Sequence, residues 1–230
     1  MKIIINEVKN YLSENEESTL LTKNWDQVKP FIHCKVYSKK ENMVRALNEH
    51  IPFFTYLDLM VTFYIQITTE SVEIPIADNH LYIWGITKQD LLKQVKINTT
   101  NNTFLFCPLS DYINTLIGDS APQIANTIDK KEENQYVITN KSAKYGASAI
   151  LLPQLFKKLS ETLDNCNFYI LPCSIHELII IPTFVYSEND FLFLRNIVLN
   201  INATLVSEED YLSDSIYYYD YELEIIRIVK

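Results

Sequence analysis

The stretch LLPQLFKKLSETL, residues 151–163, followed by NFYILPCSIHELIIIP, residues 167–182, decides the fold class. In the first part, apolar residues recur at spacings of three and four, which predicts an amphipathic helix with Pro153 tolerated in its first turn. The second part contains two apolar runs on either side of Pro172 and indicates two short strands. A helix followed at once by neighbouring strands favours an α+β fold.

The rest of the second half extends this pattern. QYVITN, residues 135–140, predicts a strand, and SENDFLFLRNIVLNI, residues 187–201, predicts a helix capped by Ser187 and Asp190. DSIYYYDYELEIIRIV, residues 214–229, reads as a closing β-hairpin. The second half therefore has the expected order β-α-β-β-α-β-β.

The first half mixes the same element types. Alternation and helical spacing predict a strand over 28–38, a helix over 41–50, a strand over 56–67, a pairing strand over 71–76 and a helix over 86–98. Thr87 and Asp90 form a short capping pattern at the start of the last helix, and NTTNNT, residues 98–103, reads as a loop. We expect an α+β protein in which amphipathic helices pack on a mixed or antiparallel sheet.

The domain organisation follows from length and local composition. With 230 residues, the chain can bury a real core within one large domain or two small ones. Residues 1–24 are polar and acidic and predict an N-terminal arm or short helix, whereas 25–230 are expected to form a single α+β domain. Turn formers followed by a charge run mark 118–134 as a candidate internal linker.

Bulk composition excludes several classes of function. The net charge is −9 and no basic run exceeds two lysines, which argues against direct binding of nucleic acid. Only 3 glycines occur, and neither of the glycine-rich nucleotide-binding patterns is present. The sequence therefore predicts no cofactor.

Cysteine spacing and hydropathy indicate a cytoplasmic protein. The four cysteines, Cys34, Cys107, Cys166 and Cys173, form no CxxC pair and no cluster at zinc-ligand spacing. We expect buried, reduced thiols and no metal. No apolar run approaches the ~20 residues of a membrane-spanning helix, and the first residues do not resemble a secretory leader.

The polar residues at 174–177 are the first candidate site. Nucleophilic catalysis needs a base within hydrogen-bond reach of the nucleophile and a third group that orients the base. If this segment is extended, Ser174 and His176 share a face but stand about 7 Å apart, and Glu177 points the other way. A local triad is therefore not expected. The competing interpretation is a polar rim around a turn, with His176 bonded to a backbone carbonyl.

Asp78 and His80 form a second candidate. An Asp-x-His pair can ligate a metal or take part in acid–base chemistry. The same residues also suit the start of a short helix, because aspartate and asparagine cap helices well. His80 and His176 would share a site if their loops met, which one sequence does not test.

The stretch TNKSAKYGASA, residues 139–149, carries serines and lysines near Gly146. A Ser-x-x-Lys nucleophile needs a lysine three residues after the serine, and Tyr145 stands there instead for Ser142. We expect that Gly146 lets the chain turn with positive φ or lets a helix pack closely.

The fourth feature is a run of tyrosines in the closing hairpin. Its candidate partner-binding residues are Tyr217, Tyr218, Tyr219, Asp220 and Tyr221. In a strand the odd-numbered residues face one way and the even-numbered ones the other, and we expect one face to be partly wet. Exposed tyrosine is common at binding hot spots. The alternative is a half-buried hairpin with no role in binding.

Five segments in order carry a family resemblance: YLDLMVTFYIQI, ADNHLYIWGITKQDLLKQVKIN, YVITNKSAKYGASAILLPQLFKKLSETL, FYILPCSIHELIIIP and EEDYLSDSIYYYD. Together they resemble an uncharacterised domain-of-unknown-function family of anaerobic Firmicutes, whose members share Trp-Gly, TN…GA, LPxSIHE and LSD…YYYD segments. The resemblance covers roughly 50–220 and implies a shortened N-terminal part here. It implies no activity, although a short stand-alone copy would suit a mobile element.

Two functional hypotheses follow. The first is a cytosolic, non-enzymatic protein that acts through a protein–protein surface, one form of which is a mobile-element-encoded inhibitor of a host system. The second is a hydrolase-like enzyme with His176 and Glu177 as acid and base, joined by His80 or Asp78. An enzyme should hold His176 in a pocket with a partner within ~3 Å. A binding protein should leave His176 satisfied by backbone and place the tyrosines outside. The sequence does not give the partner or the oligomeric state.

Overall fold

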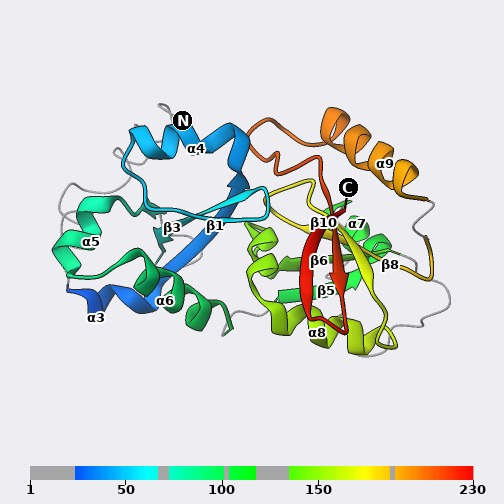
Figure 1. The fold of residues 1–230 in the computed structure, drawn as a ribbon, viewed down its shortest axis with the longest axis horizontal. Coiled ribbons are helices and arrows are strands. Elements are labelled where there is room, and N and C mark those ends of the chain that lie inside the picture. Colours follow the sequence, from blue (N-terminus) through cyan, green and yellow to red (C-terminus); the bar gives the residue numbers. More distant parts are fainter. Residues whose placement is uncertain (1–23, 67–72, 101–103, 118–134, 187–189, 230) are drawn as a thin grey trace.

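The computed structural model describes residues 24–66, 73–100, 104–117, 135–186 and 190–229. In this part of the chain, helices and two antiparallel sheets form an α+β protein, which confirms the predicted class. The two sheets lie side by side, the first in blue and cyan and the second in green, yellow and red (Figure 1). Residues 1–23 of the arm predicted over 1–24, and the whole linker predicted over 118–134, lie outside the described residues.

The first sheet is built from the first half of the chain. Its strands are β1 (Ile32–Ser38), β2 (Phe54–Tyr56), β3 (Leu59–Ile65) and β4 (Ile74–Pro75). The order is β1-β3-β2, and β4 also pairs antiparallel with β3, as predicted for 71–76. The strand predicted over 56–67 is divided, because the chain turns at Leu57, which has a φ of 55°.

Helices surround this sheet: α3 (Trp25–Val28), the 3-10 helix η1 (Lys29–Phe31), α4 (Lys39–Asn48), α5 (Asp78–Trp84) and α6 (Lys88–Thr100). The strand predicted from residue 28 begins only at Ile32, because Pro30 lies in the first turn of η1. The predicted cap of α6 is confirmed by the bond from the Asp90 backbone N–H to Thr87 Oγ1. The loop predicted from residue 98 is wrong as far as residue 100, where α6 continues. Asn98 Nδ2 anchors that turn by donating to the Lys29 and Ile32 carbonyls.

The second sheet follows the predicted order. Its elements are β5 (Phe104–Pro108), α7 (Leu109–Ile117), β6 (Tyr136–Asn140), the 3-10 helix η2 (Gly146–Leu151), α8 (Pro153–Thr162), β7 (Phe168–Leu171), β8 (Leu178–Pro182), α9 (Phe191–Thr204), β9 (Ile216–Asp220) and β10 (Ile225–Val229). From β6 to β10 this is β-α-β-β-α-β-β, and the strand order is β10-β9-β7-β8-β6-β5 with every pair antiparallel.

Helices cover both faces of the second sheet, because alternate residues of each strand are apolar on opposite sides. Phe168 and Tyr219 face α8, where Phe156 packs against both rings. Tyr169 on the other face belongs to a cluster with Leu194 of α9. The α8 face is continuous with the core of the first sheet, so one apolar cluster spans both sheets.

A half-buried carboxylate ties the two sheets together. Asp58, in the turn between β2 and β3, accepts hydrogen bonds from Ser213 Oγ at 2.6 Å and from Ser215 Oγ at 2.7 Å. The hydroxyl of Tyr217 on β9 donates to the other oxygen of the same carboxylate. A turn of the first sheet is thereby fixed to the start of β9 in the second.

Candidate functional site

His176 lies in the bend between β7 and β8, and both of its ring nitrogens are engaged. The backbone N–H of Tyr145 donates to Nδ1 at 3.2 Å, so the proton of the neutral ring is on Nε2. Nε2 is 3.1 Å from Asp210 Oδ1, and the imidazole stacks on the Tyr145 ring at 5.7 Å. In this arrangement no nitrogen lone pair is left for a substrate. His176 therefore holds two loops together, through a backbone N–H rather than the predicted backbone carbonyl.

Ser174 and Glu177 have other partners. The segment 174–176 is bent and not extended, and Ser174 Oγ accepts a hydrogen bond from the His176 backbone N–H at 3.0 Å. Burial raises the pKa of the Glu177 carboxyl, against the opposing effect of its hydrogen bonds to Ser174 and Tyr112. The assumption that Glu177 points away from Ser174 is thus wrong. Asp210, rather than Glu177, is the carboxylate that contacts the His176 ring.

The segment 140–146, called the 140–146 loop below, carries unusual backbone geometry. Ala143 and Tyr145 have φ values of 49° and 59°, a left-handed conformation that is uncommon for residues with a Cβ. Asn140 supports the loop, because its Oδ1 accepts from the backbone N–H groups of Ser142 and Lys144. The loop is therefore held in one defined shape.

Gly146 ends this loop at a point of close packing. A Cβ at this position would lie 2.4 Å from the His176 carbonyl oxygen and 2.7 Å from Thr139 Cα. Gly146 is not among the residues with positive φ, so close approach is the part of its prediction that the structure supports. The TN…GA and LPxSIHE segments of the family resemblance meet here.

A group of charged side chains joins the 140–146 loop to the first sheet. Glu73, just before β4, forms ion pairs with Lys35 of β1 and, at 2.7 Å, with Lys144. The Tyr145 hydroxyl donates to the same carboxylate at 3.0 Å. The Lys35 ammonium also lies over the rings of Tyr145 and Tyr64, 4.0 and 4.7 Å from their centres. We call Lys35, Glu73 and Lys144 the Lys-Glu-Lys cluster.

In this cluster, burial and the neighbouring charges shift the pKa values of the side chains in opposite directions. The side chains of Lys35 and Glu73 are only 13% and 15% exposed. Burial alone would raise the pKa of Glu73, but the two lysines outweigh it and hold that pKa below its usual value. Burial lowers the pKa of Lys35, and the nearby Glu73 counteracts that effect only in part. The Glu73 carboxylate therefore favours the charged form of Lys35 inside the protein.

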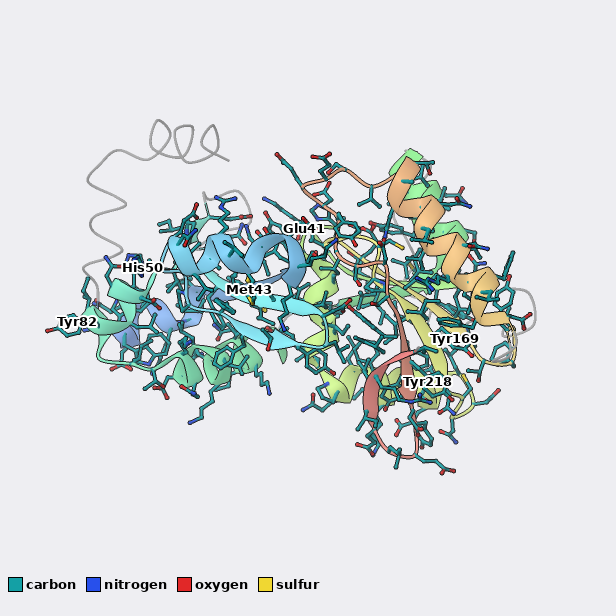
Figure 2. All side chains as sticks on the ribbon, turned by 45° about the horizontal axis from the view of Figure 1, so that its top comes forward. Glu41, Met43, His50, Tyr82, Tyr169 and Tyr218 are labelled. Atoms are coloured by element: carbon teal, nitrogen blue, oxygen red, sulfur yellow. The ribbon has the colours of Figure 1, made fainter. Side chains whose placement is uncertain are left out.

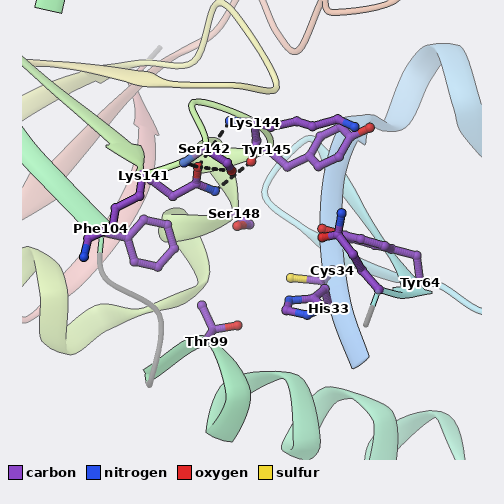
Figure 3. A pocket seen from close by; sticks show the side chains of 12 residues that line it. His33, Cys34, Tyr64, Thr99, Phe104, Lys141, Ser142, Lys144, Tyr145 and Ser148 are labelled. Atoms are coloured by element: carbon purple, nitrogen blue, oxygen red, sulfur yellow. Dashed lines mark hydrogen bonds between the residues drawn. The ribbon is translucent and has the colours of Figure 1, made fainter. Parts of the chain in front are cut away.

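A pocket of about 230 Å³ opens beside this cluster, between the two sheets (Figure 3). Its lining residues come from β1, β3, α6, β5, the 140–146 loop and η2: His33, Cys34, Tyr64, Gln66, Thr99, Phe104, Asn140, Lys141, Ser142, Lys144, Tyr145 and Ser148. Lysine is the only residue type in this lining that carries a full charge at neutral pH, because burial lowers the pKa of His33. The pocket is thus positive in a chain whose net charge is −9.

Asp78 and His80 lie elsewhere, at the start of α5. His80 Nδ1 accepts from the Ala77 backbone N–H at 3.0 Å, and its ring packs on Trp84 at 5.6 Å. Asp78 is exposed in the first turn of the same helix. Figure 1 shows α5 at the end of the first sheet that is remote from the second sheet, so His80 and His176 do not share a site. His80 thus bonds to the backbone at the start of α5, whereas the N-cap position is Ala77 and not Asp78, the first residue of the helix.

The tyrosine run is largely covered. Tyr217 and Tyr219 are fully buried, and neither can contact a partner while the sheet is intact. Tyr218, Asp220 and Tyr221 are half-buried. Figure 2 shows Tyr218 beside Tyr169, where the two rings meet edge to face at 5.6 Å. A partner surface formed by all five residues is therefore not present in this structure.

Exposed apolar side chains gather instead on α9. This helix has one charged residue, Arg195, within Phe191–Thr204. Leu194 and Val198 are buried against the sheet, whereas the exposed side of the helix carries Leu192, Phe193 and Leu199 together with the polar residues Arg195, Asn196 and Asn200. We define the α9 surface as the exposed residues Leu192, Phe193, Leu199 and Leu205.

Within the described ranges, no three His, Cys, Asp or Glu side chains gather in a way that could hold a metal ion. The same part of the chain contains no helix with both the length and the apolar character that a membrane crossing requires. All four cysteines are free thiols, and Cys166 is the one that is not fully buried.

Sequence reasoning missed most residues of the central network, which are Lys35, Glu73, Lys144, Tyr145 and Asp210. Their partners lie 31 to 72 positions away in the chain, so no local spacing links them. One available signal was Lys35, a charged residue in the middle of an alternating strand. A second was the position of Tyr145 directly before Gly146.

Comparison with known proteins places the chain in a family. A model described as a family of unknown function (DUF5688) matches residues 1–221, and the chain belongs to that family. The match extends the resemblance seen at roughly 50–220 to residue 1 and confirms it. Neither the curated proteins nor the solved structures include a match to this chain.

Proposed function

We propose that this member of the family is a binding protein that works without catalysis, through the α9 surface, on a basic protein segment with an apolar stripe. The observation that carries the proposal is the exposure of large apolar side chains on a helix with a single charge. Leu192 and Leu199 are seven residues apart and lie on one side of α9, 70% and 39% exposed, with Phe193 beside them at 52%. Contiguous exposed apolar patches mark interaction sites.

The charge around this surface selects the partner. Asp190 precedes α9, and Glu208 and Glu209 are exposed shortly after its end. Asp214 is also exposed, and Asn202 of α9 donates to its carboxylate at 2.8 Å. An apolar stripe with acidic residues at its ends complements a helix whose apolar face is flanked by lysine or arginine. An inhibitor of a host system carried by a mobile element is one form that such a protein would take.

The hydrolase-like alternative has less support. A general base needs a free lone pair facing the substrate, and both nitrogens of His176 are committed in the folded chain. His176 is not part of the pocket lining, and its contacts join loops of the protein itself. Its geometry suits the positioning of the 140–146 loop better than proton transfer.

A defined probe tests the proposal. The probe is a labelled synthetic helix with a leucine stripe flanked by lysines, and its control is the same peptide with glutamate in place of lysine. Binding is followed by fluorescence anisotropy with the parent chain, with Leu192→Glu and Leu199→Glu, and with Leu223→Glu as a matched control. Leu223 lies in the β9–β10 turn and is 65% exposed.

We expect binding of the lysine peptide to fall at least about tenfold in the two α9 variants and to stay unchanged in Leu223→Glu. The glutamate peptide should not bind. Equal losses in all three variants, or equal binding of both peptides, would refute the proposal. If the parent chain is a dimer that Leu199→Glu converts to a monomer, the occupant is a second copy and the proposed basic partner is wrong.

A further inference from the structure

The pocket between the two sheets has a lining that suits a negatively charged ligand. Lys141 and Lys144 both belong to the 140–146 loop, and their side chains extend toward opposite sides of the pocket (Figure 3). Lys144 is half-exposed while paired with Glu73. Among the described residues, no carboxylate pairs with Lys141. Lys35, Lys141 and Lys144 against Glu73 give a local balance of three positive charges and one negative charge. This local excess of positive charge occurs in a chain whose net charge is −9.

Neutral donors complete the lining from several directions. Thr99 comes from the end of α6 and Ser148 from η2, and Figure 3 shows their hydroxyls on separate elements around the space. Asn140 and Ser142 also line the pocket, but Ser142 Oγ donates to Asn140 Oδ1 and Asn140 Nδ2 donates to the Lys144 carbonyl within the loop. Donors that converge from separate elements suit a tetrahedral oxyanion.

The type of basic side chain in the pocket indicates which class of anion the pocket would bind. Planar carboxylates are recognised best by the paired N–H groups of arginine, and the lining contains lysine but no arginine. The ammonium of lysine acts as a point charge and binds phosphate from any direction. The volume of about 230 Å³ is that of roughly eight water molecules, which holds a phosphate with a small group attached. Phe104 supplies an apolar wall for such a group.

We propose that this pocket binds a phosphate-sized oxyanion, either free or as the phosphate ester of a small organic molecule. The pocket is separate from the α9 surface, so this proposal does not depend on the proposed protein partner. Ligand binding here would bridge the first sheet and the 140–146 loop, which the Lys-Glu-Lys cluster already joins.

The test is a titration followed by two-dimensional amide NMR, at 150 mM and 500 mM potassium chloride. The probes are inorganic phosphate, phenyl phosphate and benzoate. The variants are Lys141→Gln and, as a matched control, Lys158→Gln on the exposed side of α8. Lys141 has no ion pair among the described residues, so its replacement should not disturb the fold.

We expect phosphate shifts to concentrate at amides of the pocket lining and the affinity to fall about tenfold in Lys141→Gln, as for loss of one charge-assisted contact. Lys158→Gln should bind like the parent. Tighter binding of phenyl phosphate indicates an ester, and equal binding indicates the free anion. Tighter binding of benzoate overturns the proposal. The proposal is also overturned if both variants have equal effects, if the shifts are spread over surface lysines, or if no saturable binding occurs at 150 mM salt.

Discussion

Replacing Glu73 by glutamine should destabilise the protein far more than a single surface charge would. Glu73 is the sole carboxylate in contact with Lys35 among the described residues, and both side chains are about one-seventh exposed. Glutamine has a similar shape but no charge. The substitution therefore leaves the Lys35 ammonium buried without a counter-ion.

The expected magnitude follows from these contacts. Removing one partner of a buried ion pair costs about 3–5 kcal/mol. Part of that loss is offset here, because Lys35 keeps its contacts with the rings of Tyr64 and Tyr145 and cation–π contacts contribute about 0.5–2 kcal/mol. We expect a net loss of about 3 kcal/mol. For a chain of this size that lowers the melting temperature by roughly 6–12 °C.

The assay is thermal unfolding by circular dichroism, with two further variants. Glu224→Gln is the matched control, because Glu224 pairs with Lys157 on the surface and the two side chains are 49% and 43% exposed. It should cost less than about 1 kcal/mol. The double variant Lys35→Met with Glu73→Gln removes the isolated charge and should recover most of the lost stability.

The pH dependence gives a second check. The pKa of Glu73 is held below its usual 4.5 in the folded chain. The stability that this carboxylate contributes is therefore fully present above pH 4.5 and is lost as the pH falls through the folded pKa. The difference between the parent and Glu73→Gln should shrink in that acidic range. The reasoning is refuted if Glu73→Gln costs no more than Glu224→Gln, or if the double variant is as unstable as Glu73→Gln.

Three further predictions concern Gly146, Asp58 and Glu177 and are tested by urea unfolding, with Gly85→Ala as a control. Gly146→Ala should cost about 1–3 kcal/mol, because the new Cβ would lie 2.4 Å from the His176 carbonyl oxygen. Gly85→Ala, with φ of 66° and no atom within 4 Å, should cost only about 1 kcal/mol, and equal costs would contradict the clash. Asp58→Ala should cost at least about 3 kcal/mol, since three hydroxyl donors lose their acceptor, and a loss under 1 kcal/mol would argue against this tie. Burial raises the folded pKa of Glu177, so its stability contribution falls as the pH rises above 4.5. Over that pH range the stability of Glu177→Gln should increase relative to that of the parent. A difference in stability that does not change with pH would contradict this prediction.

Local patterns predicted the second half of the fold well. The apolar stripe of 151–163 became α8, in which Phe156 and Leu159 are buried. The runs on either side of Pro172 became the antiparallel pair β7 and β8. These features depend on periodicity within ten or fifteen residues, and such periodicity is set by which side of an element must leave water.

The candidate site was predicted only in part. The sequence places His176 at a turn, and the structure has it in a bend, but its contacts with Tyr145 and Asp210 do not follow from the sequence. Asp210 lies 34 positions away and was not considered, while the neighbouring Glu177 was. One face of the tyrosine run was expected to be partly wet, and Tyr218 and Asp220 are half-buried, whereas Tyr217 and Tyr219 on the other face are fully buried. The sequence of a single strand does not show how many of its faces other elements cover.

The sequence by itself determined the class of the fold, the order of its elements in the second half and the membership of its family segments. Only the tertiary structure decided that there are two sheets, that a Lys-Glu-Lys cluster lies between them, and that a positive pocket opens beside it. The physical reason is the distance along the chain over which each kind of interaction acts. Helix and strand periods act between near neighbours, whereas ion pairs such as Lys35 with Glu73, 38 residues apart, depend on how separate elements pack.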